Sequence, residues 1–147
     1  MKKAIRGVVV ALAGLAAFGV AQAANWMPVG ATDPNGGVFT VDQSSIRLEP
    51  DGVVRAWFQV EFSTPQAASN GKTFSSAKFI DRFYCKTGML SRGPEYKFDS
   101  QGNSISAIAT YDPPTDVVPG TIGETLFNYA CTTRRIRMKA DSKASNE

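Results

Sequence analysis

Residues 53–62 read VVRAWFQVEF, and this stretch predicts the type of sheet on which the fold is built. Its apolar residues recur at every second position, at Val54, Ala56, Phe58, Val60 and Phe62. Successive side chains of a strand point to opposite faces, so this spacing places these residues on one face and Trp57 with polar side chains on the other. The segment therefore predicts a strand of an antiparallel sheet that has one face in the core and one in water.

The flanking sequence predicts further strands. Residues 38–42 are rich in β-branched and aromatic side chains and follow a glycine-containing turn. Residues 72–86 predict one or two strands, and residues 95–108 predict a hairpin whose turn includes Gly102. The polar segment 63–71 predicts a loop.

A short helix is predicted in residues 118–131, which read VPGTIGETLFNYAC. Thr121 and Glu124 have the spacing of a capping box, in which the threonine oxygen accepts a backbone N–H and the glutamate accepts the threonine N–H. A helix of about ten residues is not stable alone, so it must pack on the sheet. The elements together predict an α+β fold, mainly β, with an antiparallel sheet of about six strands and one short C-terminal helix.

Residues 1–23 have the three parts of a secretory signal peptide. A start with three basic residues precedes an apolar run over residues 8–20, and Ala21 and Ala23 are the small residues that the signal peptidase reads. The run is shorter than the roughly 20 residues that a membrane-spanning helix needs. We therefore expect cleavage before Ala24, export, and a mature chain without a transmembrane segment.

The charge balance does not predict a nucleic-acid partner. The chain has 16 Lys and Arg against 13 Asp and Glu. Lys2, Lys3 and Arg6 belong to the expected leader, so the mature chain carries 13 basic and 13 acidic residues. Proteins that bind nucleic acid usually present a strongly basic surface, and this mature chain is neutral overall.

Histidine is absent from the sequence, which excludes several classes of enzyme. Ser-His-Asp and Cys-His sites need an imidazole that accepts and returns a proton near neutral pH. Ordinary zinc sites need more Cys and His ligands than this chain contains. We therefore expect no catalytic residue, no metal site and no cofactor.

The two cysteines, Cys85 and Cys131, are expected to form one disulfide. Export brings them to an oxidising compartment, where disulfides persist. Closing a loop of this length stabilises the fold by roughly 4 kcal/mol, because the bond removes entropy from the unfolded chain. Two free thiols are the alternative.

A basic cluster follows the second cysteine and is the candidate site for an anionic partner, with the residues Arg134, Arg135, Arg137 and Lys139. Such a cluster suits a sulfated glycan, a lipopolysaccharide or an acidic protein surface. The alternation of charged and apolar residues favours another interpretation, an edge strand with Ile136 and Met138 turned inward and with charges that discourage edge pairing.

Acidic residues offer a second, catalytic interpretation. Asp112, Asp116 and Glu124 lie close together in the sequence, and a pair of carboxylates is the minimum for glycoside hydrolysis. The capping box already accounts for Glu124, and the turn before Pro113 accounts for Asp112. The pattern therefore gives little support to a hydrolase.

Other polar and aromatic residues give no separate site. A serine-lysine hydrolase would have to use Ser44, Ser45, Lys72 or Lys78, and no motif brings these residues together.

The two tryptophans, Trp26 and Trp57, are residues of a type that often anchors binding surfaces. Packing in or near the core is the expectation for both tryptophans.

The order of these features resembles the surface-adhesin protein E family. The residues that carry the resemblance extend from 26 to 131: Trp26, VDQSSI at 41–46, the strand with Trp57, DRFYC at 81–85, Tyr96, Gly102, PGTIGE at 119–124, and Cys131. The resemblance implies a small domain of antiparallel strands with a short helix, closed by a Cys85–Cys131 disulfide.

The resemblance also implies a function. It suggests an adhesin that binds matrix and plasma proteins of a host and is held on the outer surface as a lipoprotein. This sequence has no cysteine near the expected cleavage point for lipid attachment, and it has TDVV at 115–118 where the family pattern would place a tryptophan.

We therefore expect an exported, non-enzymatic binding protein with an adhesin-E-like domain over residues 24–140 and a disordered tail over 141–147. The partner would be a protein or sulfated glycan of the host matrix or the cell envelope. The periplasm is the first expected location, with the cell surface or secretion as alternatives. A periplasmic envelope factor that shares only the fold, and a carboxylate-dependent hydrolase, are the alternative functions. Nothing in the sequence predicts the oligomeric state.

Overall fold

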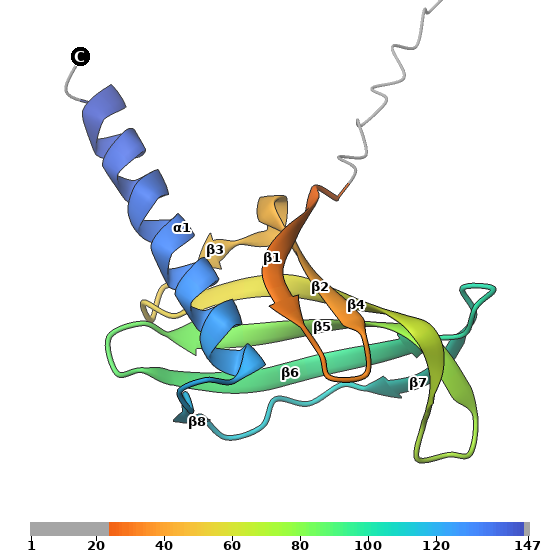
Figure 1. The fold of residues 1–147 in the computed structure, drawn as a ribbon. Helices are drawn as coiled ribbons and strands as arrows, with labels where there is room; N and C mark the ends of the chain where they lie inside the picture. Colours follow the sequence, from red (N-terminus) through yellow and green to blue (C-terminus); the bar gives the residue numbers. More distant parts are fainter. Residues whose placement is uncertain (1–23, 146–147) are drawn as a thin grey trace, which may run out of the picture.

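An antiparallel sheet forms the frame of the molecule (Figure 1). The structure is a computed structural model that describes residues 24–145; the expected signal peptide and the last two residues lie outside the described part. Within that part the strands are β1 Trp26–Thr32, β2 Gly37–Asp42, β3 Arg47–Leu48, β4 Val54–Ala67, β5 Thr73–Tyr84, β6 Met89–Phe98, β7 Ser104–Ile108 and β8 Thr115–Asp116. A 3₁₀ turn, η1, covers Gln43–Ser45, and the α-helix α1 covers Ile122–Ala144.

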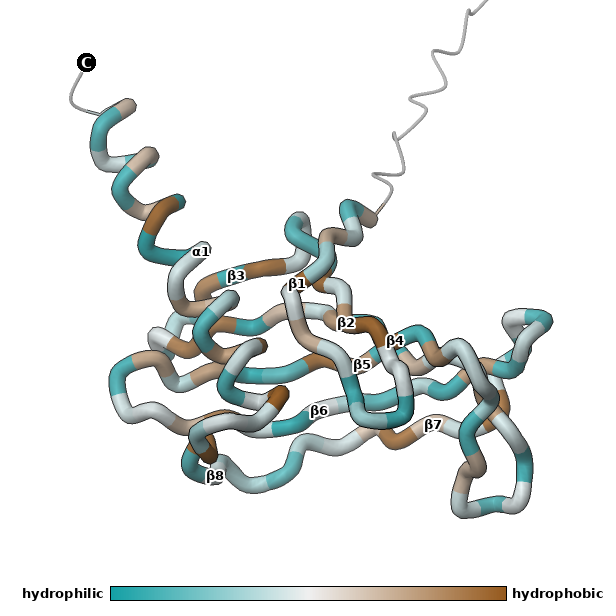
Figure 2. Tube along the Cα trace, viewed as in Figure 1, coloured by the Kyte–Doolittle hydropathy of each residue, from teal (hydrophilic) through white to brown (hydrophobic). Residues whose placement is uncertain are grey.

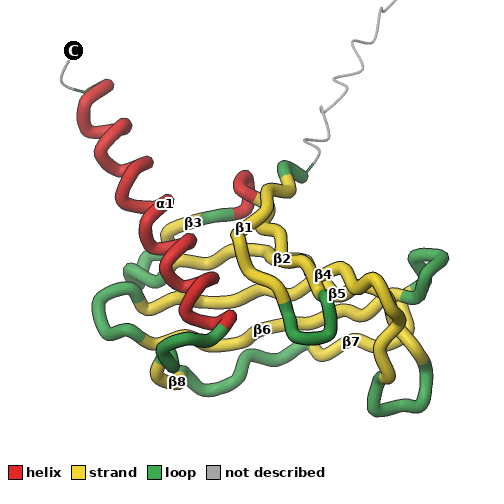
Figure 3. The backbone as a smooth tube through the Cα atoms, in the orientation of Figure 1, coloured by secondary structure: helices red, strands yellow, loops and turns green. Residues whose placement is uncertain are grey.

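The predicted fold class is confirmed. Six strands form a continuous path in the order β1-β2-β4-β5-β6-β7, while β3 pairs with β4 and β8 pairs with β6. The eight strands exceed the expected number by two because β3 and β8 have two residues each and carry no periodic pattern. Figure 3 shows the helix lying against one side of the strands.

Strand β4 has one face in the core, as the pattern of residues 53–62 predicts, and with β5 it forms the centre of the sheet. Val54, Ala56, Phe58 and Val60 of β4 are buried on one face. The same strand continues to Ala67 through a segment that was expected to be a loop. At the end of β4, Gln66 and Ala67 pair again with β5 after an irregularity in the register. This pairing makes the segment a strand although its polar composition predicts a loop.

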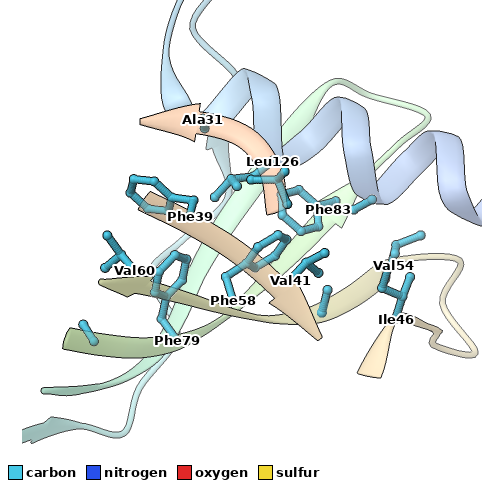
Figure 4. Close-up of a cluster of buried hydrophobic side chains, with 14 of the residues drawn as sticks. Ala31, Phe39, Val41, Ile46, Val54, Phe58, Val60, Phe79, Phe83 and Leu126 are labelled. Atoms are coloured by element: carbon cyan, nitrogen blue, oxygen red, sulfur yellow. The ribbon is translucent and has the colours of Figure 1, made fainter. Parts of the chain in front are cut away.

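The core lies between the sheet and the helix (Figure 4). Phe58 and Phe83 are fully buried there, and their rings meet edge to face with centroids 5.7 Å apart. Phe39 and Val41 of β2 extend the same apolar face. Figure 2 shows hydrophobic and hydrophilic residues alternating along the strands, as expected for a sheet with one face in the core.

The start of α1 has the predicted cap with one difference. The Thr121 hydroxyl accepts the backbone N–H of Glu124 at 3.3 Å, as expected. The Glu124 carboxylate accepts the N–H of Gly120 at 2.8 Å instead of that of Thr121. The reciprocal bond is thus displaced by one residue and fastens the turn before the N-cap to the first turn of the helix.

The helix is longer than expected, with 23 residues. The predicted edge strand at 134–139 is wrong, and residues 141–144, expected to begin a disordered tail, form the last turn of α1. Residues 124–145 contain no glycine or proline that would end the helix early. After Cys131 no residue of α1 is buried, and this outer half extends beyond the sheet (Figure 1).

The predicted disulfide is confirmed. Cys85 follows β5 and Cys131 lies in α1; their Cα atoms are 5.8 Å apart, and they are separated by 46 positions in the sequence. The bond fastens the helix to the end of a central strand at the point where burial of the helix stops.

Replacing both cysteines, Cys85→Ala with Cys131→Ala, should lower the free energy of unfolding by about 2–4 kcal/mol, because the unfolded chain regains the entropy of the open loop. Chemical denaturation of the oxidised parent and the double variant measures the difference. The reduced parent is the control and should unfold near the double variant. Equal stability of the oxidised parent and the variant would contradict the prediction.

Candidate functional site

The basic cluster that the sequence singled out lies on the outer half of α1. Arg135 and Lys139 are exposed, and their spacing of four residues places them on one side of the helix. Ile136 does not turn inward and is 64% exposed. The outer half of α1 therefore presents cations and isolated apolar side chains to solvent.

Arg137 has a structural role in addition to its charge. Its guanidinium donates to the backbone carbonyl of Gln43 at 2.7 Å and to that of Ile46 at 3.1 Å. Gln43 in turn donates its side-chain amide to the Tyr129 hydroxyl at 2.8 Å. These bonds tie α1 to η1, so the four basic residues do not form one uniform patch.

Arg134 and Arg137 line a cleft between α1 and β3, with a volume of about 230 Å³. Arg47 contributes a third guanidinium, and the remaining lining residues are Ile46, Leu48, Met138 and Asp141. Leu48 and Met138 are each about half exposed. The cleft thus combines three cations with one carboxylate and an apolar wall.

A buried carboxylate, Asp81, was not singled out by the sequence analysis. It lies in β5 on the core face, between Phe79 and Phe83, and is 1% exposed. The Arg92 Nε atom is 3.7 Å from one carboxylate oxygen, and neither oxygen completes a hydrogen bond of full geometry. Burial raises the pKa of Asp81 to about 6, and Arg92 with the Gly93 amide offsets only part of this effect.

A groove of about 250 Å³ lies beside this ion pair on the core face. Phenylalanine side chains form much of its lining: Phe39, Phe62, Phe74 and Phe79. Arg92 and Lys97 border it, and their charges lie 5.2 Å from the Phe79 ring centroid and 4.9 Å from the Phe74 ring centroid. The acidic side chains of Asp33 and Glu95 balance these two cations. The groove is therefore apolar inside and neutral overall.

The acidic residues considered for hydrolysis are held by local structure. The Glu124 carboxylate is occupied by the N–H of Gly120. The Asp112 backbone binds β6, since its N–H donates to the Arg92 carbonyl at 2.7 Å and its carbonyl accepts the Ser91 hydroxyl. Asp116 is exposed in the two-residue strand β8. The Glu124 carboxylate thus caps the helix, whereas Asp112 and Asp116 are held by bonds of their backbone.

The serines and lysines considered as a hydrolase pair lie on different elements. Ser44 and Ser45 belong to η1, and both hydroxyls donate to oxygens of Asp42. Lys72 is in the turn before β5. Lys78 points its ammonium at the ring of Trp26, 5.6 Å from the centroid.

The two tryptophans lie on the sheet face opposite α1 and are half buried. Trp57 pairs with Ile80 of β5, and its ring centroid is 6.1 Å from that of Tyr96. The alternation in β4 already placed Trp57 on the solvent side, which was the signal against packing in the core.

Two broader features concern residues 24–145. No helix in this part is long and apolar enough to cross a membrane. The same part contains no cluster of three or more Cys, Asp or Glu side chains arranged to bind a metal ion.

A sheet closed on one face by a helix and one disulfide, with charged and aromatic surfaces outside, defines a small α+β domain. The chain belongs to the surface-adhesin protein E family, whose model matches residues 26–132. The match ends at Thr132, one residue after the second cysteine, so it does not include most of the outer half of α1.

Solved structures of Haemophilus influenzae protein E share the fold. The selenomethionine form has a TM-score of 0.54 and 14% identity, over 73% of this chain and 85% of that chain. Crystal form II has a TM-score of 0.53 and 14% identity, over 64% and 80%. Protein E from the non-typeable bacterium has a TM-score of 0.50 and 14% identity, over 76% and 85%. No curated protein matches the chain in sequence.

Asp81 should make stability depend on pH. Its pKa is higher in the folded state than in the unfolded chain, so the fold favours the protonated form and loses stability as the pH rises through about 6. The difference in the free energy of unfolding between Asp81→Asn and the parent should shift by about 3 kcal/mol in favour of the variant between about pH 4 and pH 7. Denaturant unfolding across this range measures the gain.

The matched control is Asp116→Asn, which changes an exposed aspartate in the same way. The free energy of unfolding of this variant should differ from that of the parent by a nearly constant amount over the same pH range. If Asp81→Asn and Asp116→Asn give the same pH profile, the interpretation of the buried carboxylate is wrong.

Proposed function

We propose that this chain is an exported, non-enzymatic binding protein whose partner is a protein or sulfated glycan of the host matrix or the cell envelope. The observation that carries the proposal is membership of a surface-adhesin family over residues 26–132. Fold similarity alone would not support a function, because one fold serves many functions.

The outer half of α1 is the proposed contact surface for an anionic group of this partner. Arg135 and Lys139 are exposed on one side, with Lys143 one turn further along the helix. Arg137 holds the helix against η1, Arg134 lines the cleft between α1 and β3, and both add to the local positive charge. Like charges four residues apart repel one another, and an anionic partner would remove this cost.

The proposed location is outside the cytoplasm, in the periplasm, on the cell surface or in the medium. The family of surface adhesins and the signal-like residues 1–23 support export. Protease treatment of intact cells, read out with an antibody to residues 24–145 and a periplasmic marker, separates the locations. Loss of the signal supports an adhesin on the surface; protection until the outer membrane is opened supports a periplasmic factor with the same fold.

Removing the exposed cations of α1 should weaken binding to heparin, a sulfated glycan. The variant Arg135→Ala with Lys139→Ala should elute from a heparin column at a lower salt concentration than the parent, because fewer counterions are exchanged. Lys72→Ala with Lys86→Ala is the matched control, since it removes the same charge from exposed turns. An unchanged elution of the α1 variant, or an equal shift of both, would exclude the helix as the contact surface.

A further inference from the structure

The sheet face opposite α1 carries a group of aromatic side chains that the proposed function does not use. They come from separate parts of the chain and are all at least partly exposed: Trp26, Trp57, Tyr96, Phe98 and Tyr111. We call this surface the aromatic face. Ile80, the aliphatic residue beneath it, is 6% exposed, so the accessible apolar surface consists mainly of rings.

The strand register brings the central part of the aromatic face together. Trp57 of β4 and Tyr96 of β6 lie on either side of β5, and their ring planes are inclined by 34°. Lys78 of β5 pairs with Tyr96 across the strands. Its ammonium lies 5.6 Å from the Trp26 ring centroid and 5.7 Å from the Phe98 ring centroid. A cation is thus placed between the Trp26 and Phe98 rings, beside Tyr96.

Tyr111 is held at the edge of this face by a glycine and an arginine. A Cβ atom at Gly93 would collide with the Tyr111 ring, so the absence of a side chain there lets the ring lie against the sheet. The Arg82 guanidinium lies 4.8 Å from the centre of that ring. Glu49 fixes Arg82 through an ion pair of 2.6 Å. The ring is therefore positioned before any ligand arrives.

Lys78 favours an anionic ligand at the centre of the aromatic face. Of the carboxylates on this face, Glu49 is paired with Arg82, that of Asp42 accepts bonds from Asn25 and Ser44, and that of Glu61 accepts the side-chain amide of Gln59. Lys78 forms no ion pair within the part of the chain that the structure describes. The ammonium is thus a cation without a carboxylate partner in the middle of the rings, complementary to a negative group.

Rings separated by polar and cationic side chains suit a sugar better than the apolar centre of a protein interface. A sugar ring presents C–H groups on its faces, which are attracted to the negative faces of aromatic rings, and hydroxyl groups at its edge, which need hydrogen-bond partners. Gln59 and Lys78 lie in the same cross-strand row as Tyr96 and supply such polar groups. The centre of a protein interface is usually depleted of lysine, whereas Lys78 lies among the rings of this face.

We propose that the aromatic face binds an acidic oligosaccharide, with sugar rings stacked on Trp57 and Tyr96 and a carboxylate of the sugar paired with Lys78. This site is separate from the outer half of α1, so the proposal goes beyond the proposed function and does not depend on it.

The two tryptophans of the chain both lie on this face, so intrinsic fluorescence reports its occupancy directly. The probe is a hyaluronan hexasaccharide, which carries uronate groups and no sulfate; the neutral N-acetylglucosamine hexasaccharide is the control ligand. The oxidised chain from residue 24 onward should change its fluorescence with the acidic probe and bind the neutral probe at least about tenfold more weakly.

Three variants assign the contacts. Trp57→Ala should weaken binding of the acidic probe at least about tenfold, whereas Trp57→Phe, which keeps a ring, should lose much less. Lys78→Gln should bring the affinities for the acidic and neutral probes together. Calorimetric titration measures all three affinities, and thermal unfolding of each variant verifies that it is folded.

Lys72→Ala with Lys86→Ala is the control for lost charge, since it removes two lysines from exposed turns, and it should bind the hexasaccharide like the parent. The proposal is overturned if the acidic probe does not bind at millimolar concentration, if both probes bind the parent equally, or if folded Lys78→Gln and Trp57→Ala behave like the parent while Arg135→Ala with Lys139→Ala loses binding. The last result would assign the sugar to the helix.

Discussion

The attachment of α1 to the apolar face of the sheet is the constraint on which the rest of the structure depends. Three of its 23 residues are buried, namely Leu126, Ala130 and Cys131. Phe127 adds an edge contact with Phe83, with ring centroids 6.1 Å apart. This is little apolar contact for a helix of that length, so the Cys85–Cys131 bond and the Arg137 hydrogen bonds are a large part of the attachment.

Because α1 covers only one face of the sheet, and only in part, the domain exposes three surfaces with different chemistry. Beside the start of α1 the core face stays open as a neutral groove with a phenylalanine lining. The outer half of the helix carries cations beyond the edge of the sheet. The uncovered sheet face presents rings and Lys78. A small domain with a single helix cannot bury both sides of its sheet, and the exposed aromatic residues are therefore available for binding.

Local patterns account for the parts of the fold that the sequence predicted. The alternation in β4, the turn at Gly102 and the threonine cap at Thr121 each depend on neighbours within a few residues. The segment after Cys131 was misread because charged and apolar residues alternate there. That alternation fits a strand, while the absence of Gly and Pro over residues 124–145 also allows a helix.

The sequence by itself determined the antiparallel sheet, the capped helix and the disulfide, because periodicity, capping chemistry and a single possible pair of cysteines are local or countable properties. Only the tertiary structure decided which side chains share a surface. Burial of Asp81 beside Arg92, separation of Arg137 from Arg135, and convergence of Trp26, Lys78 and Phe98 all depend on strand register and helix placement. Residues from β1, β5 and β6 meet there through pairings across the sheet, and no pattern along one segment encodes those distances.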